Sequence, residues 1–206
     1  MGVAGLLPVL KPVAESASLE RNIGKTVAID TYSWLHKAVF CCADKIVMDM
    51  PTKAYWGYFN KKLNMLRHFQ ITPYFVLDGD YLPRKAGTEV ERENRRDTYK
   101  KQALDAHDAG NSRLAFSNFQ KACDVSPELA KSLIEEFKAH NIKYIVAPYE
   151  ADSQLVYLEK IGEVDAIISE DSDLLVFGAQ ILLTKLNDQG VFVEIRRENF
   201  KNCHGS

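Results

Sequence analysis

Four short apolar runs in this sequence are each followed, at or just after their last residue, by carboxylates. This repeated arrangement constrains the fold more than any other feature. The runs cover residues 25–30, 74–77, 143–147 and 165–169. They are rich in β-branched and aromatic residues, as is typical of buried β-strands. Segments with helical periodicity separate them, so the pattern predicts an α/β fold with a mostly parallel central sheet. The acids at or just after the runs are Asp30, Asp78, Glu150, Asp152, Asp171 and Asp173.

These six acids are expected to converge, because the carboxyl ends of parallel strands lie at one edge of a sheet, where ligand sites form. Carboxylates held close together repel one another and raise one another's pKa, a cost that a bound cation offsets. Oxygen ligands without matching histidines favour Mg²⁺ or Mn²⁺ over zinc. Six carboxylates exceed what one Mg²⁺ takes from a protein, so the sequence predicts a two-metal site of the kind that hydrolyses phosphoesters.

Two other interpretations of the last acids stay open on the residues alone. Asp171 and Asp173 are also suited to the first turn of a helix, where acids are favoured. The run Asp171-Ser172-Asp173 also fits a phosphatase that uses an aspartate as its nucleophile.

Helices are predicted over residues 32–45, 52–68, 111–123 and 126–140, and the opening of the chain is expected to be irregular. Residues 181–184 and 191–194 predict a hairpin. In the third of these helices, five residues are expected to share one packed face: Leu114, Ala115, Phe116, Phe119 and Ala122.

Two stretches are notably basic. The helix expected over residues 52–68 contains Lys53, Lys61, Lys62 and Arg67 and no acid. A solvated face is favoured there over a DNA contact. Residues 84–101 hold seven bases and four acids with few apolar residues, which indicates an exposed helix, inserted as an arch or lid.

Composition narrows the class of protein. The 206 residues have a net charge of −2, but outside the six acids 26 bases face 22 acids, so charge distribution matters more than the total. The four cysteines lack zinc-binding spacing, which favours a reducing compartment. We expect no signal peptide, because the apolar start is short and broken by Pro8, and no membrane association.

Blocks of residues along the chain resemble the flap endonuclease/XPG superfamily. They are Met1-Gly2-x-x-Gly5-Leu6-Leu7, Asp30-Thr31-Tyr32-Ser33-Trp34-Leu35-His36, Phe75-Val76-Leu77-Asp78-Gly79, Ala147-Pro148-Tyr149-Glu150-Ala151-Asp152 and Ser169-Glu170-Asp171-Ser172-Asp173-Leu174-Leu175. The resemblance implies a PIN-like nuclease fold with an inserted helical arch. It divides the chain into an N-terminal nuclease region over residues 1–99, an arch and connector over 100–137, and an internal nuclease region over 138–206.

The resemblance also implies an activity and a site. The activity is 5′ to 3′ removal of nucleotides from duplex DNA, with 5′-flap cleavage, using two Mg²⁺ ions for which Mn²⁺ can substitute. The six acids correspond to metal ligands, with Asp78, Asp171 and Asp173 counted as catalytic together with Lys85 and Arg92. The residues expected to contact DNA are Gly2, Tyr32, His36, Lys85, Arg92, Arg95, Arg96 and Lys185.

The resemblance further implies partners and a location. The substrates are double-stranded DNA with 5′ ends, nicks, gaps or 5′ flaps, and the setting is DNA repair in the nucleus. Relatives continue into a helix-two-turn-helix element with one more metal-binding aspartate, and into a tail that meets mismatch-repair proteins, whereas this sequence stops at Ser206. The alternative expectation is therefore a catalytically impaired fragment that binds metal or DNA.

Overall fold

The computed structural model describes residues 6–79 and 86–202. Within this part the chain divides into two compact units. The first, here called the sheet unit, comprises residues 6–33, 61–79 and 137–202. The second, the helical unit, comprises residues 34–60 and 86–136. In the described part, no helix is both long enough and apolar enough to cross a membrane.

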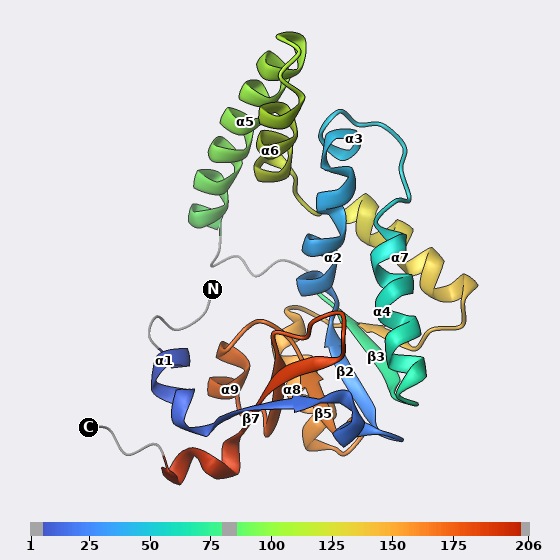
Figure 1. The fold of residues 1–206 in the computed structure, drawn as a ribbon, viewed down its shortest axis with the longest axis vertical. Helices are drawn as coiled ribbons and strands as arrows, with labels where there is room; N and C mark the ends of the chain where they lie inside the picture. The colour runs from blue at the N-terminus through green and yellow to red at the C-terminus, as the bar shows by residue number, and fades with distance from the viewer. Residues whose placement is uncertain (1–5, 80–85, 203–206) are drawn as a thin grey trace. The chain divides into compact units, whose positions relative to one another are not determined.

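The sheet unit is built on seven strands in the order β1-β7-β6-β5-β2-β3-β4 (Figure 1). Strands β6, β5, β2, β3 and β4 run parallel to one another, and β7 and β1 extend the sheet as antiparallel neighbours. The strands are β1 (Ala14–Ser18), β2 (Thr26–Asp30), β3 (Thr72–Leu77), β4 (Tyr144–Val146), β5 (Ala166–Ile168), β6 (Ile181–Thr184) and β7 (Val191–Arg196). The four predicted sheet strands and the predicted hairpin are all present.

Helices α8 (Ala151–Lys160) and α9 (Asp173–Phe177) cover one face of this sheet (Figure 1). Their buried leucines share a core with apolar side chains from the central strands: Leu155, Leu158, Leu174, Ile167 and Leu182. On the opposite face the Phe75 ring packs 4.5 Å from the ring of Phe137. Alternation along β3 therefore places a packed layer on each side of the sheet.

The remaining elements of the chain are mostly helical. They are α1 (Leu6–Leu10), α2 (Thr31–Val39), α3 (Ala43–Val47), α4 (Trp56–His68), α5 (Ala86–Asp108), α6 (Ser112–Ala122) and α7 (Pro127–Ala139), together with 3₁₀ turns at Lys11–Val13 (η1), Leu19–Asn22 (η2), Phe40–Cys42 (η3) and Arg197–Asn202 (η5). In the helical unit, α5 and α6 form an antiparallel hairpin (Figure 1).

Several expectations about these elements were wrong in detail. Strand β1 falls in the segment expected to be irregular, because its sequence Ala-Glu-Ser-Ala-Ser lacks strand formers and pairing with β7 holds it extended. The helix expected over residues 32–45 is interrupted at Phe40–Cys42 by η3. The helix expected from Thr52 begins only at Trp56.

Two expectations about side chains were also wrong. Leu114 and Phe116 do not share the packed face of α6: they are 50% and 38% exposed, whereas Ala115, Phe119 and Ala122 are buried. The buried residues of the stripe pack against Ala103 and Ala106 of α5, with Tyr99 partly buried beside them. The basic face of α4 is not wholly solvated, because Lys62 is only 3% exposed.

Candidate metal centre

The six acids follow four strands that are neighbours in the sheet. Asp30 is the last residue of β2, and Asp78 follows directly after β3. Glu150 is the N-cap residue of α8, beyond β4, and Asp152 lies in the first turn of that helix. Asp171 lies beyond the end of β5, and Asp173 begins α9. Because β5, β2, β3 and β4 are parallel and adjacent, the structure brings all six acids to the same edge of the sheet.

Ser169 connects two of these acids. Its hydroxyl donates to Asp30 Oδ2 at 2.7 Å, and its Oγ accepts the backbone N–H of Asp171 at 3.0 Å. Asp30 Oδ1 also accepts the N–H of Ser33 at 3.1 Å, so both oxygens of this carboxylate are fixed. Ser169 is buried, and the sequence prediction did not assign it a role. The only sequence signal was its position at the end of a strand, immediately before the acids.

Asp78 is held against the start of α8. The N–H of Ala151 donates to Asp78 Oδ1 at 2.6 Å, which places the carboxylate at the positive end of the helix. Gly79 makes this approach possible, because a Cβ at residue 79 would overlap with the carbonyl oxygen of Ala147. The N–H of Gly79 also donates to the carbonyl of Tyr149 at 2.6 Å. The loops after β3 and β4 are therefore packed together where their acids emerge.

The acids at this edge interact electrostatically. Burial raises the pKa of Asp152 to about 6, and the charges of four other acids add to the shift: Asp171, Asp30, Asp78 and Glu150. The pKa of Asp30 is also raised, first by burial and then by Asp78 and Asp171, although its hydrogen bonds to Ser169 and Ser33 oppose the rise. Both shifts have the direction expected where negative charge is crowded and partly desolvated.

The donor set fits divalent cations that prefer oxygen. Among the residues described, however, no three carboxylates, imidazoles or thiolates form a ready-made metal-binding group. The two observations are compatible, because Coulomb repulsion acts over longer distances than metal–oxygen bonds and keeps like charges apart. A cation placed among these acids would offset the repulsion that adds to the effect of burial on the pKa of Asp152. The fixed backbone positions and the chemistry of the donors therefore suit Mg²⁺ or Mn²⁺.

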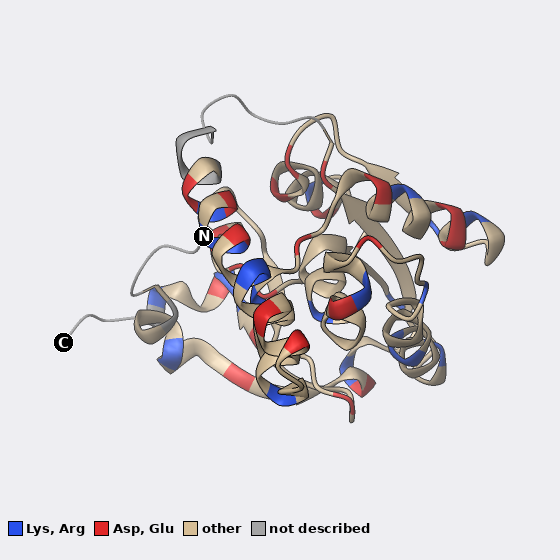
Figure 2. Cartoon of the chain, turned by 90° about the horizontal axis from the view of Figure 1, so that it is seen from above, with Lys and Arg blue, Asp and Glu red and all other residues tan. Residues whose placement is uncertain are grey.

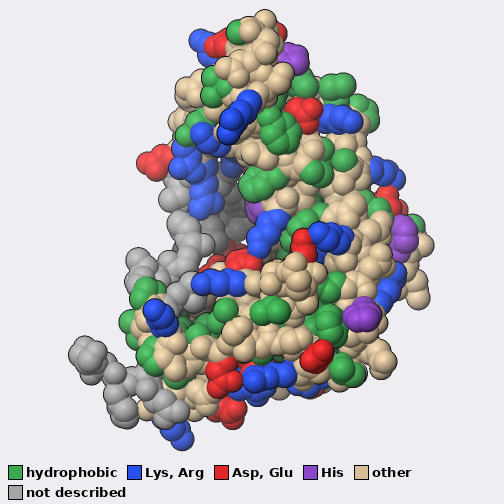
Figure 3. Space-filling view, viewed as in Figure 1, with side chains coloured by type: hydrophobic (Ala, Val, Ile, Leu, Met, Phe, Trp, Pro, Cys, Tyr) green, Lys and Arg blue, Asp and Glu red, His purple; other side chains and the backbone are tan. Residues whose placement is uncertain are grey.

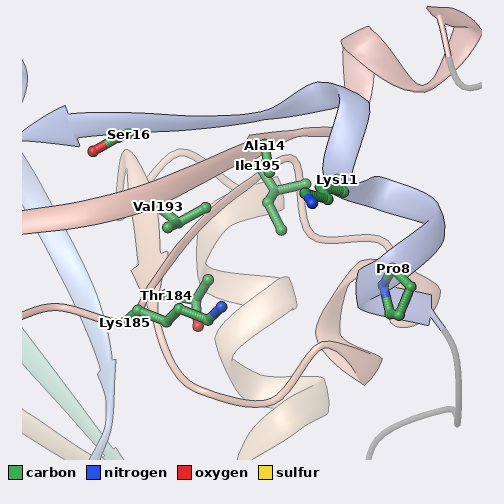
Figure 4. A pocket seen from close by; sticks show the side chains of 8 residues that line it. All are labelled: Pro8, Lys11, Ala14, Ser16, Thr184, Lys185, Val193 and Ile195. Atoms are coloured by element: carbon green, nitrogen blue, oxygen red, sulfur yellow. The ribbon is translucent and has the colours of Figure 1, made fainter.

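A cavity of about 530 Å³ lies in the same unit, beside the end of β6. Lys11 and Lys185 approach it from opposite sides, and Val193 and Ile195 lie between them (Figure 4). Its other lining residues are Pro8, Ala14, Ser16 and Thr184. Glu170, which directly precedes Asp171, accepts a hydrogen bond from the Thr184 hydroxyl at 3.1 Å. The cavity wall is thus bonded to the loop that carries two of the acids.

The other predicted contact residues lie on helices or outside the described part. Tyr32 is half-buried and His36 exposed, both on α2. Arg92 and Arg95 are exposed on α5, and Arg96 lies 3.0 Å from Asp124. Acidic and basic residues are mixed along α5 (Figure 2), and basic side chains gather along its side of the hairpin (Figure 3). Gly2 and Lys85 lie outside the described residues.

Comparison with known proteins now identifies the family. The family model of the XPG N-terminal domain matches residues 1–99, and that of the XPG I-region matches residues 141–202. The chain belongs to the XPG/flap endonuclease superfamily. This confirms the resemblance inferred from the motifs, because the two matched regions together include all six acids.

Two relatives from Saccharomyces cerevisiae are close in sequence. DNA damage-inducible protein DIN7 is 49% identical over 97% of this chain and 46% of its own length. Exodeoxyribonuclease 1 is 48% identical over 97% of this chain and 28% of its own length. The chain thus spans less than half the length of either relative.

A solved structure confirms the predicted fold class. The catalytic core of Rad2 in complex with a DNA substrate superposes with a TM-score of 0.71. The match covers 98% of this chain and 56% of that one at 24% identity. At this identity the likeness establishes the fold, a PIN-like α/β architecture.

Proposed function

We propose that this chain is a metal-dependent DNA nuclease that removes nucleotides from the 5′ ends of duplex DNA and cleaves 5′ flaps. The observation that carries the proposal is the set of six acids at one edge of the parallel sheet, with the electrostatic coupling centred on Asp152. The names of the relatives support the reaction class and a setting in DNA repair. We place that repair function in the nucleus.

The six acids would hold two Mg²⁺ ions, or Mn²⁺ in their place. Such a pair of ions supplies an activated water and stabilises the leaving oxygen of a phosphodiester. The protein's own contribution is to fix the ligands before the substrate arrives. Ser169 orients Asp30, the N–H of Ala151 orients Asp78, and the N–H of Asp173 donates to Asp171 Oδ1 at 2.9 Å.

Basic and aromatic residues would hold the DNA. We assign Arg92, and with it Lys85, to the scissile phosphate, where a guanidinium offsets the charge that develops during cleavage. Tyr32 and His36 would contact the DNA at the junction where the strand is cut. Four other residues would contact the DNA backbone: Gly2, Arg95, Arg96 and Lys185. The substrates in this proposal are DNA ends, nicks, gaps and flaps.

The test uses this chain with 5′-labelled duplex and 5′-flap DNA, in Mg²⁺ and in EDTA. We expect labelled mononucleotides or short flap products in Mg²⁺ and none in EDTA. Asp171→Asn should lower the rate by more than about a hundredfold, because loss of a ligand exceeds the usual effect of losing a residue that orients one. The absence of any metal-dependent product at high protein concentration would contradict the proposal.

The same variant distinguishes the proposed nuclease from a phosphatase. A phosphatase that uses Asp171 as nucleophile would form a covalent phospho-aspartate and would release phosphate without cutting the chain. We expect no such intermediate, and shortening of the DNA strand instead. Exposed Asp105→Asn on α5 is the matched control, since it makes the same chemical change in the helical unit and leaves the six acids intact.

A further inference from the structure

Lys62 is a buried lysine in an otherwise ordinary basic helix. It lies on α4 and is 3% exposed, whereas the side chain of its neighbour Lys61 is 62% exposed. Burying an ammonium group is costly unless hydrogen bonds and an opposite charge compensate for the lost water. The position of Lys62 therefore requires partners within the sheet unit.

Three partners of Lys62 belong to the turn between β6 and β7. Lys62 Nζ donates to the carbonyl oxygens of Leu186 at 3.3 Å and Asn187 at 3.2 Å. It also lies 3.0 Å from Asp188 Oδ1. Hydrogen bonds from Lys61 and Lys62 lower the pKa of Asp188 below its ordinary value, so this acid keeps its charge beside them. One ammonium group thus fixes three consecutive residues of the turn.

The opposite end of the same turn is bonded to the loop that carries the acids. The N–H of Lys185 donates to Glu170 Oε2 at 3.3 Å, and the Thr184 hydroxyl donates to the same oxygen. Lys185 has a φ of 57°, a left-handed conformation that is uncommon for a residue with a side chain. Such a conformation persists only where its surroundings hold it. Glu170 on one side and Lys62 on the other provide that restraint.

Lys185, the residue held in this left-handed conformation, lines the cavity beside the end of β6. The side chain of Lys185 points along the cavity wall toward the space that Lys11 enters from the other side (Figure 4). A free lysine side chain has many rotamers, so an ammonium group binds a phosphate better when its backbone is already fixed. The geometry of the turn therefore matters for any anion that Lys185 binds.

We propose that Lys62 is a positioning residue for Lys185. By fixing Leu186–Asp188 from within the sheet unit, it holds Lys185 in its left-handed conformation with the ammonium group directed toward a phosphate of the DNA substrate. This inference rests on the proposed function and on the phosphate contact assigned there to Lys185. It gives a function to a basic residue that the sequence assigned to a solvated surface.

The test compares Lys62→Met with Lys61→Met. Methionine keeps an unbranched apolar chain and removes the ammonium group, and both variants remove one charge that faces Asp188. We expect Lys62→Met to raise the KM and the Kd for 5′-flap DNA about tenfold with kcat within about twofold, because one oriented ionic contact is lost. We expect Lys61→Met to change each value by less than about twofold, as is usual for an exposed pair.

A double variant separates positioning from loss of stability. In a Lys185→Ala background, adding Lys62→Met should change the Kd for DNA by less than about twofold, because Lys185 carries the effect. Amide hydrogen exchange at residues 185–191 should accelerate in Lys62→Met and not in Lys61→Met. If Lys62→Met does not fold, Asp188→Asn tests the same ion pair by changing the residue in the turn. We then expect smaller increases in the exchange rate at residues 185–191 and in the Kd for DNA.

The outcomes are distinct for the two proposals. Equal loss of DNA affinity in the Lys62→Met and Lys61→Met variants would make Lys62 a mere surface charge and overturn the inference alone. Additive losses in the double variant would do the same. A third outcome is that the unmodified chain binds no DNA while exchange at residues 185–191 still depends on Lys62. In that case the proposed function is wrong, and the positioning role, which depends on it, is wrong as well.

Discussion

The acidic edge of the sheet unit and the α5–α6 hairpin of the helical unit hold their charges in opposite ways. At the sheet edge, backbone N–H groups and a buried hydroxyl fix the carboxylates of Asp30, Asp78 and Asp171. On the hairpin, Arg92 and Arg95 project from an exposed helix face. The hairpin is held together by apolar packing, in which Phe119 is buried among Ala103, Ala106, Ala115 and Ala122 and Tyr99 packs against them.

The difference follows from what each charge is expected to do. Metal ligands must be placed within a few tenths of an ångström, so they lie at strand ends where the backbone is rigid. Charges that meet a DNA backbone need long side chains and tolerate adjustment, which an exposed helix provides. Polar restraint at one region and apolar restraint at the other should respond differently to substitution.

The largest effect is expected for Phe119→Ala. Removing this large buried side chain from the packed face of the hairpin should destabilise it by about 3–5 kcal/mol. Amide hydrogen exchange should show lost protection across α5 and α6, while Mg²⁺-dependent chemical shifts at residues 150–173 stay as in the unmodified chain. Leu114→Ala on the same helix is the control: because Leu114 is 50% exposed, we expect less than about 0.5 kcal/mol. Loss of the Mg²⁺ response together with the hairpin would show that the two regions do not fold independently.

A smaller effect, on function more than on stability, is expected for Ser169→Ala. The change removes the donor to Asp30 Oδ2 and the acceptor for the Asp171 N–H, and so loosens two ligands at once. We expect metal affinity or DNA cleavage to fall about 10- to 100-fold, the usual result of losing a residue that orients ligands. Isothermal titration with Mg²⁺ and initial cleavage rates measure it.

The control for Ser169→Ala is Ser33→Ala. Ser33 bonds to Asp30 through its backbone N–H, and that bond survives the substitution. We expect activity within about twofold of the unmodified chain, since the hydrogen bond to Asp30 is kept and only the hydroxyl of Ser33 is lost. If both serine variants were equally active, the hydroxyl of Ser169 would have no part in holding the ligands.

Features set by residues close together in the sequence could be predicted, whereas those set by remote residues could not. The strands and their terminal acids are local signals, since each apolar run and the acids beyond it lie within a few residues of one another. The burial of Lys62 could not be predicted, because its acceptors lie in a turn more than 120 residues away and its local pattern is that of an exposed basic helix. Strand β1 was missed for the same reason, since its partner β7 lies at the other end of the chain. The role of Ser169 likewise depends on Asp30, which is remote in sequence.

The smallest effect, and the one most specific to the acidic edge, concerns pH. The pKa of Asp152 is raised from 3.8 to about 6 in the folded protein, chiefly by burial and then by four neighbouring acids. The folded state therefore keeps a proton between about pH 4 and pH 6 that the unfolded chain releases. By linkage, the stability associated with Asp152 falls as pH rises through this window, and the full penalty remains above it.

Asp152→Asn removes this penalty, because an amide cannot ionise. We expect the variant and the unmodified chain to be equally stable below about pH 4. Without divalent cations, the variant should become more stable by about 1–2 kcal/mol by pH 7; a shift of two pKa units corresponds to about 3 kcal/mol, and partial exposure reduces it. Urea unfolding at each pH measures the difference. Adding Mg²⁺ at pH 7 should reverse the order, since the cation binds more tightly to, and so stabilises more, the chain that keeps this ligand. A gap that grows toward low pH would have the opposite sign and would exclude burial and charge crowding as the source of a raised Asp152 pKa.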